Sequence, residues 1–147
     1  MSFSTFSGPI RAGTVRYGTG ENTGLVTLSQ SAALPLTTTA TTIVLPAGSQ
    51  IVNINIDVTT TFTTGSTLAV GDGTTAAKYV TAITTAAAGR QALSPTAAQL
   101  TSWYNIGTSD VTITITMAGT TAVAGAGYIT VVYVQKTSDG SANPATP

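Results

Sequence analysis

The sequence predicts an all-β protein, a single jelly-roll-like β-sandwich, and three observations lead to that prediction. Residues 51–58, Ile-Val-Asn-Ile-Asn-Ile-Asp-Val, alternate between apolar and polar side chains, which is the period-two pattern of a half-buried strand. Residues 111–117 repeat the pattern with threonine as the polar partner, so the two strands can share one core. Turn-forming residues separate further short β-branched runs at regular intervals, as in sandwiches.

Eight short strands are expected in chain order, separated by turns and loops. In the strand at 51–58 the even-numbered residues Val52, Ile54, Ile56 and Val58 are expected to face the core, because all four are apolar. A polar break is expected at 29–31, Ser-Gln-Ser, directly after a short strand. The expected strands are residues 12–17, 25–28, 37–45, 51–58, 67–70, 78–83, 111–117 and 127–135.

The last of these strands differs from the others because it is apolar on both faces. Tyr128, Val132 and Val134 fall on one face, whereas residues 129, 131 and 133 supply the other. A strand that is apolar on both sides belongs in the middle of a sheet or at an interface.

One short helical turn is expected between residues 86 and 100, where alanine and leucine are frequent. The pattern favours Ser94 as the N-cap and Pro95 as the first helical residue, with the turn running through Leu100. Gly89 and the shortness of the stretch predict a loop around it.

Three segments follow from this reading: an N-terminal arm at 1–24, the sandwich at 25–135 and a flexible tail at 136–147. Glycines make the strand at 12–17 weak by itself. The arm nevertheless carries apolar anchors and two arginines that could pair with acidic groups on a partner. The alternative interpretation of this segment is a frayed terminus. The apolar anchors are Phe3, Phe6, Ile10, Val15 and Tyr17. The candidate contact residues are Phe3, Phe6, Ile10, Arg11, Arg16 and Tyr17.

Composition excludes several functional classes. The chain has no cysteine and no histidine, so it lacks thiol chemistry, the commonest general base and the commonest metal ligand. Charged residues make up only 7% of the chain against about 25% in ordinary domains, and the net charge is zero. A surface this uncharged favours association with copies of itself or with a partner, and disfavours nucleic acid. No enzyme activity and no cofactor are expected.

No secretory signal pattern and no apolar run of about 20 residues occurs, so we expect a product made in the cytoplasm and no membrane partner.

Two further groups of residues were weighed as sites. Asp57 and Asp72 form a carboxylate pair only if their strands pair, and Asp72 lies in Gly-Asp-Gly, which is typical of a turn. Calcium at this turn lacks the spaced acidic ligands it needs. Trp103 and Tyr104 suit a core or subunit contact better than a sugar-stacking platform, and we assign them as candidate oligomer contacts.

Five stretches follow one another in a characteristic order. They are Leu-Pro-Ala-Gly at 45–48 with the strand that follows to 62, Gly-Ser-Thr-Leu-Ala-Val-Gly-Asp-Gly at 65–73, Lys-Tyr-Val at 78–80, Asp-Val-Thr-Ile-Thr-Ile-Thr at 110–116 and Gly-Tyr-Ile-Thr-Val-Val-Tyr-Val at 127–134. Together they resemble capsid decoration, or cement, proteins of tailed phages, including cyanophages. The resemblance covers about residues 8–135 and rests on patterns rather than on a catalytic signature.

The resemblance implies a sandwich that trimerises or clusters on the outer surface of the mature capsid. It also implies an extended segment that clamps neighbouring major capsid protein subunits. A head-fibre or tail-associated module that binds a receptor or glycan through Trp103, Tyr104 or the loop at 118–127 is the main alternative. A bacterial surface adhesin is a third.

Overall fold

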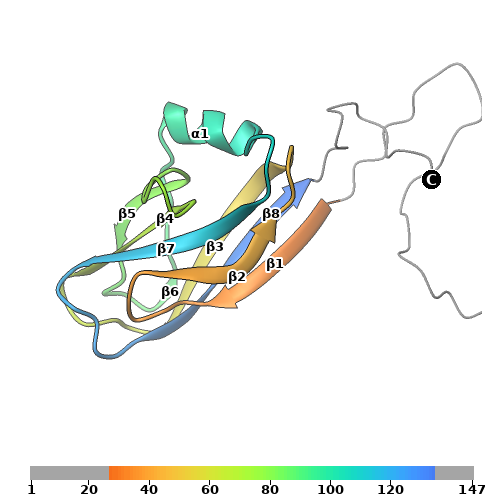
Figure 1. Cartoon of the computed structure of the whole chain (residues 1–147). Helices are drawn as coiled ribbons and strands as arrows, with labels where there is room; N and C mark the ends of the chain where they lie inside the picture. Colours follow the sequence, from red (N-terminus) through yellow and green to blue (C-terminus); the bar gives the residue numbers. More distant parts are fainter. Residues whose placement is uncertain (1–26, 135–147) are drawn as a thin grey trace, which may run out of the picture.

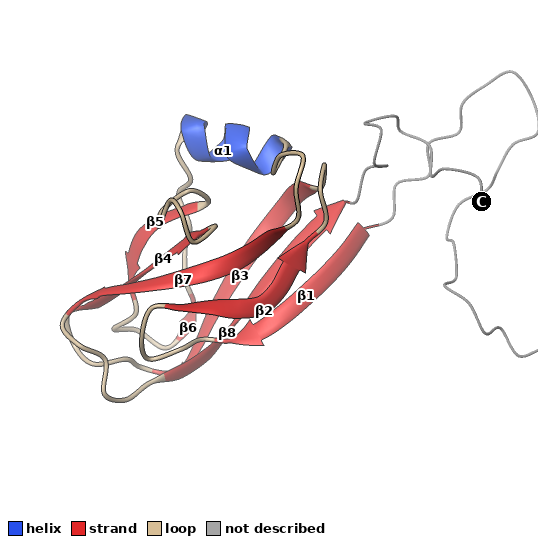
Figure 2. Ribbon diagram, viewed as in Figure 1, coloured by secondary structure: helices blue, strands red, loops and turns tan. Residues whose placement is uncertain are grey.

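The computed structural model describes residues 27–134. The expected arm, with Phe3, Phe6, Ile10, Arg11, Arg16 and Tyr17, and the expected tail lie outside the described residues. The regular secondary structure of the described part consists of strands and one short helix, joined by loops (Figure 2). The elements are β1 (Thr27–Ala33), β2 (Thr39–Leu45), β3 (Gln50–Thr60), β4 (Ser66–Gly71), β5 (Val80–Thr84), β6 (Gly89–Arg90), α1 (Ala97–Tyr104), β7 (Val111–Gly119) and β8 (Ala126–Val134).

The strands form two antiparallel four-stranded sheets. Sheet A has the order β1-β8-β3-β6, and sheet B has the order β2-β7-β4-β5. Each strand of the first half therefore pairs with its mirror-image strand in the second half: β1 with β8, β2 with β7, β3 with β6 and β4 with β5. This nesting is what a long hairpin gives when it is rolled up, and it confirms the expected jelly-roll-like sandwich.

The core lies between the two sheets and contains residues from both of the strands that carried the prediction. Ile54 and Ile56 of β3 in sheet A and Ile113 and Ile115 of β7 in sheet B are all buried and belong to the same cluster. The expectation that these strands share one core is confirmed. Helix α1 lies across one end of the sandwich (Figure 1).

The expected inward position of Val52 is wrong. The side chain of Ile51 is 3% exposed and that of Val52 is 51% exposed, because the pairing of β3 with β8 shifts register between Ile51 and Asn53. A bulge places one extra residue in a strand and so changes which side chains face inward on its two sides. The alternation expected from Ile54 to Val58 holds.

The expected break at 29–31 is also wrong. All three residues lie inside β1, which pairs with β8 without a register shift from Thr27 to Ala33. The polar residues are tolerated because β1 is an edge strand of sheet A and because the inward-facing Gln30 is hydrogen-bonded. Its side-chain amide contacts Val44 of β2 and the hydroxyl of Tyr133.

The helix begins two residues later than expected and is longer. Thr96, not Ser94, is the N-cap: its hydroxyl accepts from the backbone N–H of Gln99, and the Gln99 side chain accepts from the Thr96 backbone N–H. This reciprocal capping box satisfies two otherwise unpaired helical donors. The helix then continues past Leu100 to Tyr104, so Trp103 and Tyr104 are helical.

The apolar last strand lies mid-sheet, as expected. β8 pairs with β1 on one side and β3 on the other. Ile129, Val131 and Tyr133 are buried toward the core, whereas Tyr128 is 55% exposed on the outer face.

Candidate functional site

Each of the two aspartates that were candidates for a catalytic pair forms an ion pair with a different basic side chain. Asp57 of β3 lies 3.1 Å from Nε of Arg90 on β6, and Asp72, in the loop after β4, lies 2.8 Å from Nζ of Lys78. The two carboxylates belong to different sheets, because β3 pairs with β6 and β8 while β4 pairs with β5 and β7. Their strands β3 and β4 therefore do not pair, and the condition for a carboxylate pair of Asp57 and Asp72 is not met.

Asp72 organises the loop between β4 and β5. Its Oδ1 accepts hydrogen bonds from the backbone N–H groups of Thr74 and Thr75, at 3.0 and 2.7 Å. Burial by itself raises the pKa of Asp72, but the hydrogen bonds from Lys78 and from these amides outweigh it and leave the pKa below its ordinary value. The Lys78 pKa is raised, chiefly by the same hydrogen bond. This is the chemistry of a turn held by an ion pair, as the Gly-Asp-Gly composition indicated.

The described residues contain no cluster of three or more acidic side chains able to hold a metal ion. At the Asp72 turn the carboxylate oxygens already accept from Lys78 and from two backbone amides. Calcium would have to displace that lysine, so the geometry gives it no support there.

Trp103 and Tyr104 point to different sides of α1. Trp103 packs against the core, and its indole Nε1–H donates to the backbone carbonyl of Tyr79 at 2.9 Å. Tyr104 is 64% exposed and shares a helix face with Leu100, which is four residues earlier and 49% exposed. A stacking platform made of both rings is therefore not formed. The pair divides into a core residue, Trp103, and a surface residue, Tyr104, that remains a candidate oligomer contact.

None of the helices in the part of the chain described here is long and apolar enough to cross a membrane.

The outer face of sheet A carries a row of polar and aromatic side chains that crosses β8, β3 and β6. Tyr128, Asp57 and Arg90 lie opposite one another on β8, β3 and β6, so their side chains form one row across the sheet. Toward the edge, the Thr130 hydroxyl donates to Ser31 on β1. The row combines one aromatic ring with an internally neutralised ion pair, which suits a flat, uncharged contact.

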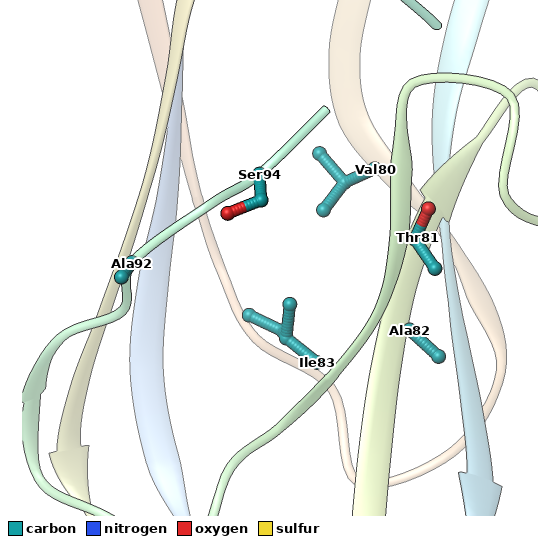
Figure 3. Close-up of a pocket in the computed structure, with 6 residues that line it drawn as sticks. All are labelled: Val80, Thr81, Ala82, Ile83, Ala92 and Ser94. Atoms are coloured by element: carbon teal, nitrogen blue, oxygen red, sulfur yellow. The ribbon is translucent and has the colours of Figure 1, made fainter. Parts of the chain in front are cut away.

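A shallow groove of about 240 Å³ lies between β5 and the segment that follows β6 (Figure 3). Val80 and Ile83 project from β5 into the gap, and Ala92 and Ser94 line the opposite wall. The sequence did not predict this groove, because the strand pattern does not show which strand lies at the edge of a sheet. The Thr81 and Ala82 side chains complete the lining.

No family model matches the chain, and no curated protein matches it. Among solved structures, a chain of the acid-stable capsid of Helicobacter pylori bacteriophage KHP30 matches with a TM-score of 0.57 and 15% identity, over 75% of this chain and 88% of that one. A chain of the cyanophage Pam1 capsid asymmetric unit matches with a TM-score of 0.55 and 20% identity, over 88% of this chain and 99% of that one.

These likenesses show a shared fold. Both matching chains come from phage capsid structures, which agrees with the resemblance to tailed-phage capsid-associated proteins that the sequence carries.

Proposed function

We propose that the chain is a non-enzymatic structural protein of a phage virion that decorates the outer surface of the mature capsid and stabilises it by binding across major capsid protein subunits. The observation that carries the proposal is the sandwich itself, which matches chains of two phage capsid structures over 88% and 99% of their length. A match over nearly a whole chain supports a similar use of the whole domain, rather than a shared fragment.

The surface supports an architectural role. With 7% charged residues and zero net charge, the chain presents mostly hydroxyl, amide and small apolar groups. Both ion pairs among the described side chains join residues of this chain to each other, leaving little net field to steer a charged ligand. Such a surface loses little solvation when it is covered by another uncharged protein surface.

The point at which the chain leaves the sandwich supports an anchoring arm. Thr27 at the start of β1 pairs with Val134 at the end of β8, and Val134 also pairs with Gln50. Gln50 follows Ser49, whose carbonyl accepts from the backbone N–H of Ile106, just beyond α1. Thr27 and Val134, the first and last described residues, therefore lie at the end of sheet A near α1.

In this proposal the arm clamps the major capsid protein and Tyr104 contributes to contacts within a homotrimer. The arm residues assigned to the capsid are those with apolar or guanidinium side chains: Phe3, Phe6, Ile10, Arg11, Arg16 and Tyr17. Apolar side chains supply the buried area, and arginine forms directed bonds to carboxylates.

Weak individual contacts suffice for this function. Joining several copies multiplies their affinity without new contacts, since later contacts form at an effective concentration in the mM range. A protein that binds only the expanded shell stabilises it by mass action, with about 2.7 kcal/mol per site at a hundredfold excess over the dissociation constant.

Co-sedimentation tests the proposal. Purified full-length chain and a version lacking residues 1–20 are mixed with expanded and with unexpanded capsids of the phage that carries the gene. We expect the full-length chain to pellet with expanded capsids and the truncated chain to stay in the supernatant. If the full-length chain ignores both kinds of capsid, the decoration role is wrong, and retention on immobilised host polysaccharide would then favour the receptor- or glycan-binding alternative.

A further inference from the structure

The sandwich has two pairs of edge strands, β1 with β2 and β5 with β6, and the contact between the two sheets differs at these two sides. On the side where β1 and β2 are the edge strands, the Gln30 amide spans the sheets: its Nε2 donates to the Val44 carbonyl at 2.7 Å and its Oε1 accepts from the Val44 N–H at 3.1 Å. On the side of β5 and β6, the groove of Figure 3 takes the place of such a bridge. Within residues 27–134 no backbone hydrogen bond joins β5 to the segment at 92–94.

The free edge of β5 is a template for another strand. Among the described strands β5 pairs with β4 on one side and with nothing on the other. An edge strand presents backbone N–H and C=O groups that can pair with an added strand, while pockets accept alternate side chains of that strand. Ile83, which is only partly buried, provides the apolar floor for such side chains, and Val80, which is 3% exposed, also lines the groove.

The size and chemistry of the groove favour a peptide over a small molecule. Its volume of about 240 Å³ is below the roughly 300–1,000 Å³ of small-molecule pockets. Its lining is Val80, Thr81, Ala82, Ile83, Ala92 and Ser94, with no charged side chain. The occupant that fits is an extended segment with small and apolar side chains on one face.

We propose that residues 12–17 of a second copy of this chain occupy the groove as an added strand along β5. The segment reads Ala-Gly-Thr-Val-Arg-Tyr, in which Val15 and Tyr17 alternate with Thr14 and Arg16. In an extended conformation Val15 and Tyr17 share one face, which meets Val80 and Ile83, and Arg16 faces outward.

The positions of donor and acceptor favour a second copy. The segment precedes β1, whereas β5 and β6 form the opposite side of the sandwich from β1 and β2. Between Tyr17 and Thr27 the chain spans at most about 33–36 Å, which lets the segment extend away from the strand that it precedes. An arm leaving one side and a receptor on the other make a head-to-tail contact, which generates a closed ring when the rotation allows.

This inference goes beyond the proposed function because it concerns contacts between copies that exist without a capsid. It assigns Val15 and Tyr17 to the neighbouring copy and leaves Phe3, Phe6, Ile10, Arg11 and the outward-facing Arg16 for the capsid. A chain that exchanges strands but ignores capsids would overturn the proposed function only. A chain that binds capsids without exchanging strands would overturn the inference only.

Cysteine cross-linking tests it cleanly, because the full-length chain has no cysteine of its own. Val15→Cys and Ala92→Cys chains are purified separately, mixed without capsids and oxidised, and the products are separated without reductant and identified by mass spectrometry of the linked peptides. The groove dimer is the disulfide-linked product of these two chains. Ala40→Cys is the matched control, since Ala40 is also an exposed alanine but lies on β2, at the other edge of sheet B. Its disulfide-linked product with the Val15→Cys chain is the control dimer.

We expect roughly tenfold more groove dimer than control dimer, because a docked segment raises the local thiol concentration toward the mM range. Equal yields of the two dimers would overturn the proposal. So would a chain carrying both Val15→Cys and Ala92→Cys that closes its disulfide within one molecule, since the arm would then occupy its own groove.

A second variant blocks the edge without changing the arm. Ala82→Pro removes a backbone N–H from an edge strand, a place where proline is tolerated. Circular dichroism checks that it folds. When Ala82→Pro is present, we expect the solution mass from light scattering to fall toward that of a monomer and the groove dimer to be lost. An unchanged mass with an unchanged yield of groove dimer contradicts the inference.

Discussion

The side-chain amide of Gln30 on β1 is hydrogen-bonded to both the N–H and the carbonyl of Val44 on β2. This side chain therefore makes the backbone contacts that a neighbouring strand would make, and it links the two sheets. The bonds fall where the pairing of β2 with β7 shifts register, between Ala40 and Val44. A third bond from the Gln30 Nε2 to the Tyr133 hydroxyl, at 2.8 Å, ties the amide to β8.

Replacing Gln30 by leucine should destabilise the protein by about 1–3 kcal/mol. Three hydrogen bonds are lost, each worth about 0.5–1.5 kcal/mol net, but Val44 is partly exposed and water can replace some of them. Urea unfolding measures the change as a lower midpoint at constant slope. Ser29→Ala, an exposed outward position on the same strand, is the control and should change stability by less than about 0.5 kcal/mol. Equal effects of the two substitutions would contradict the bridging role.

Thr96→Ala should cost about 1 kcal/mol, because Thr96 is the N-cap of α1. Ser94→Ala should cost nothing measurable, since Ser94 makes no capping bond and is exposed. Comparing these two variants tests whether the helix is capped by Ser94, as expected from the sequence, or by Thr96, as in the structure. Thermal unfolding of both variants decides between them, and a larger loss for Ser94→Ala would reverse the assignment.

The ion pair of Asp72 and Lys78 should make stability depend on pH at both extremes. The Asp72 pKa is lowered from 3.8, so its contribution is complete above that value and is lost as the pH falls through the folded-state pKa. The Lys78 pKa is raised from 10.5, so its contribution is complete below that value and is lost as the pH rises through the folded-state pKa.

Urea unfolding between about pH 2 and 5 and near pH 11 tests this for wild type, Asp72→Asn and Lys78→Gln. Both variants should be less stable than wild type at neutral pH by a modest amount, since the side chains are 15% and 30% exposed. They should also lose less stability than wild type on the acid side. Identical acid slopes in all three proteins would show that this pair does not contribute.

Trp103 and Tyr104, neighbours in the sequence, should respond differently to truncation. Trp103→Ala should cost about 3 kcal/mol, because it removes packing against the core and the bond to the Tyr79 carbonyl. Tyr104→Ser should cost much less unfolding free energy than Trp103→Ala, because Tyr104 is 64% exposed. It should also lower the solution mass if Tyr104 contributes to the oligomer. Unfolding and light scattering on both variants check this. A large stability loss for Tyr104→Ser would place that residue in the fold instead.

The sequence predicted the sandwich because period-two alternation in β3 and β7 is strong and local. It missed the outward position of Val52 because a bulge is decided by pairing with β8, and alternation carries no information on the partner strand. Gln30 was expected in a break between strands, because a polar side chain can face inward only when it is hydrogen-bonded. Its hydrogen-bond partners, Val44 and Tyr133, lie 14 and 103 positions away in the chain, so no local pattern reveals them.

The candidate contact surfaces were less predictable than the fold. Trp103 and Tyr104 could be singled out as aromatic residues, but only the helix that begins at Thr96 turns one inward and the other outward. The groove beside β5 depends on strand order across two sheets, which no local pattern reports.

Heat and low-salt tolerance of virions tests the central proposal most directly. Virions made with and without this protein are heated in the presence of a DNA-binding dye, and the temperature of DNA release is recorded at high and low salt. The decoration role predicts release at a lower temperature in its absence, restored by adding back the full-length chain but not the chain lacking residues 1–20. Equal release temperatures with and without the protein would contradict it.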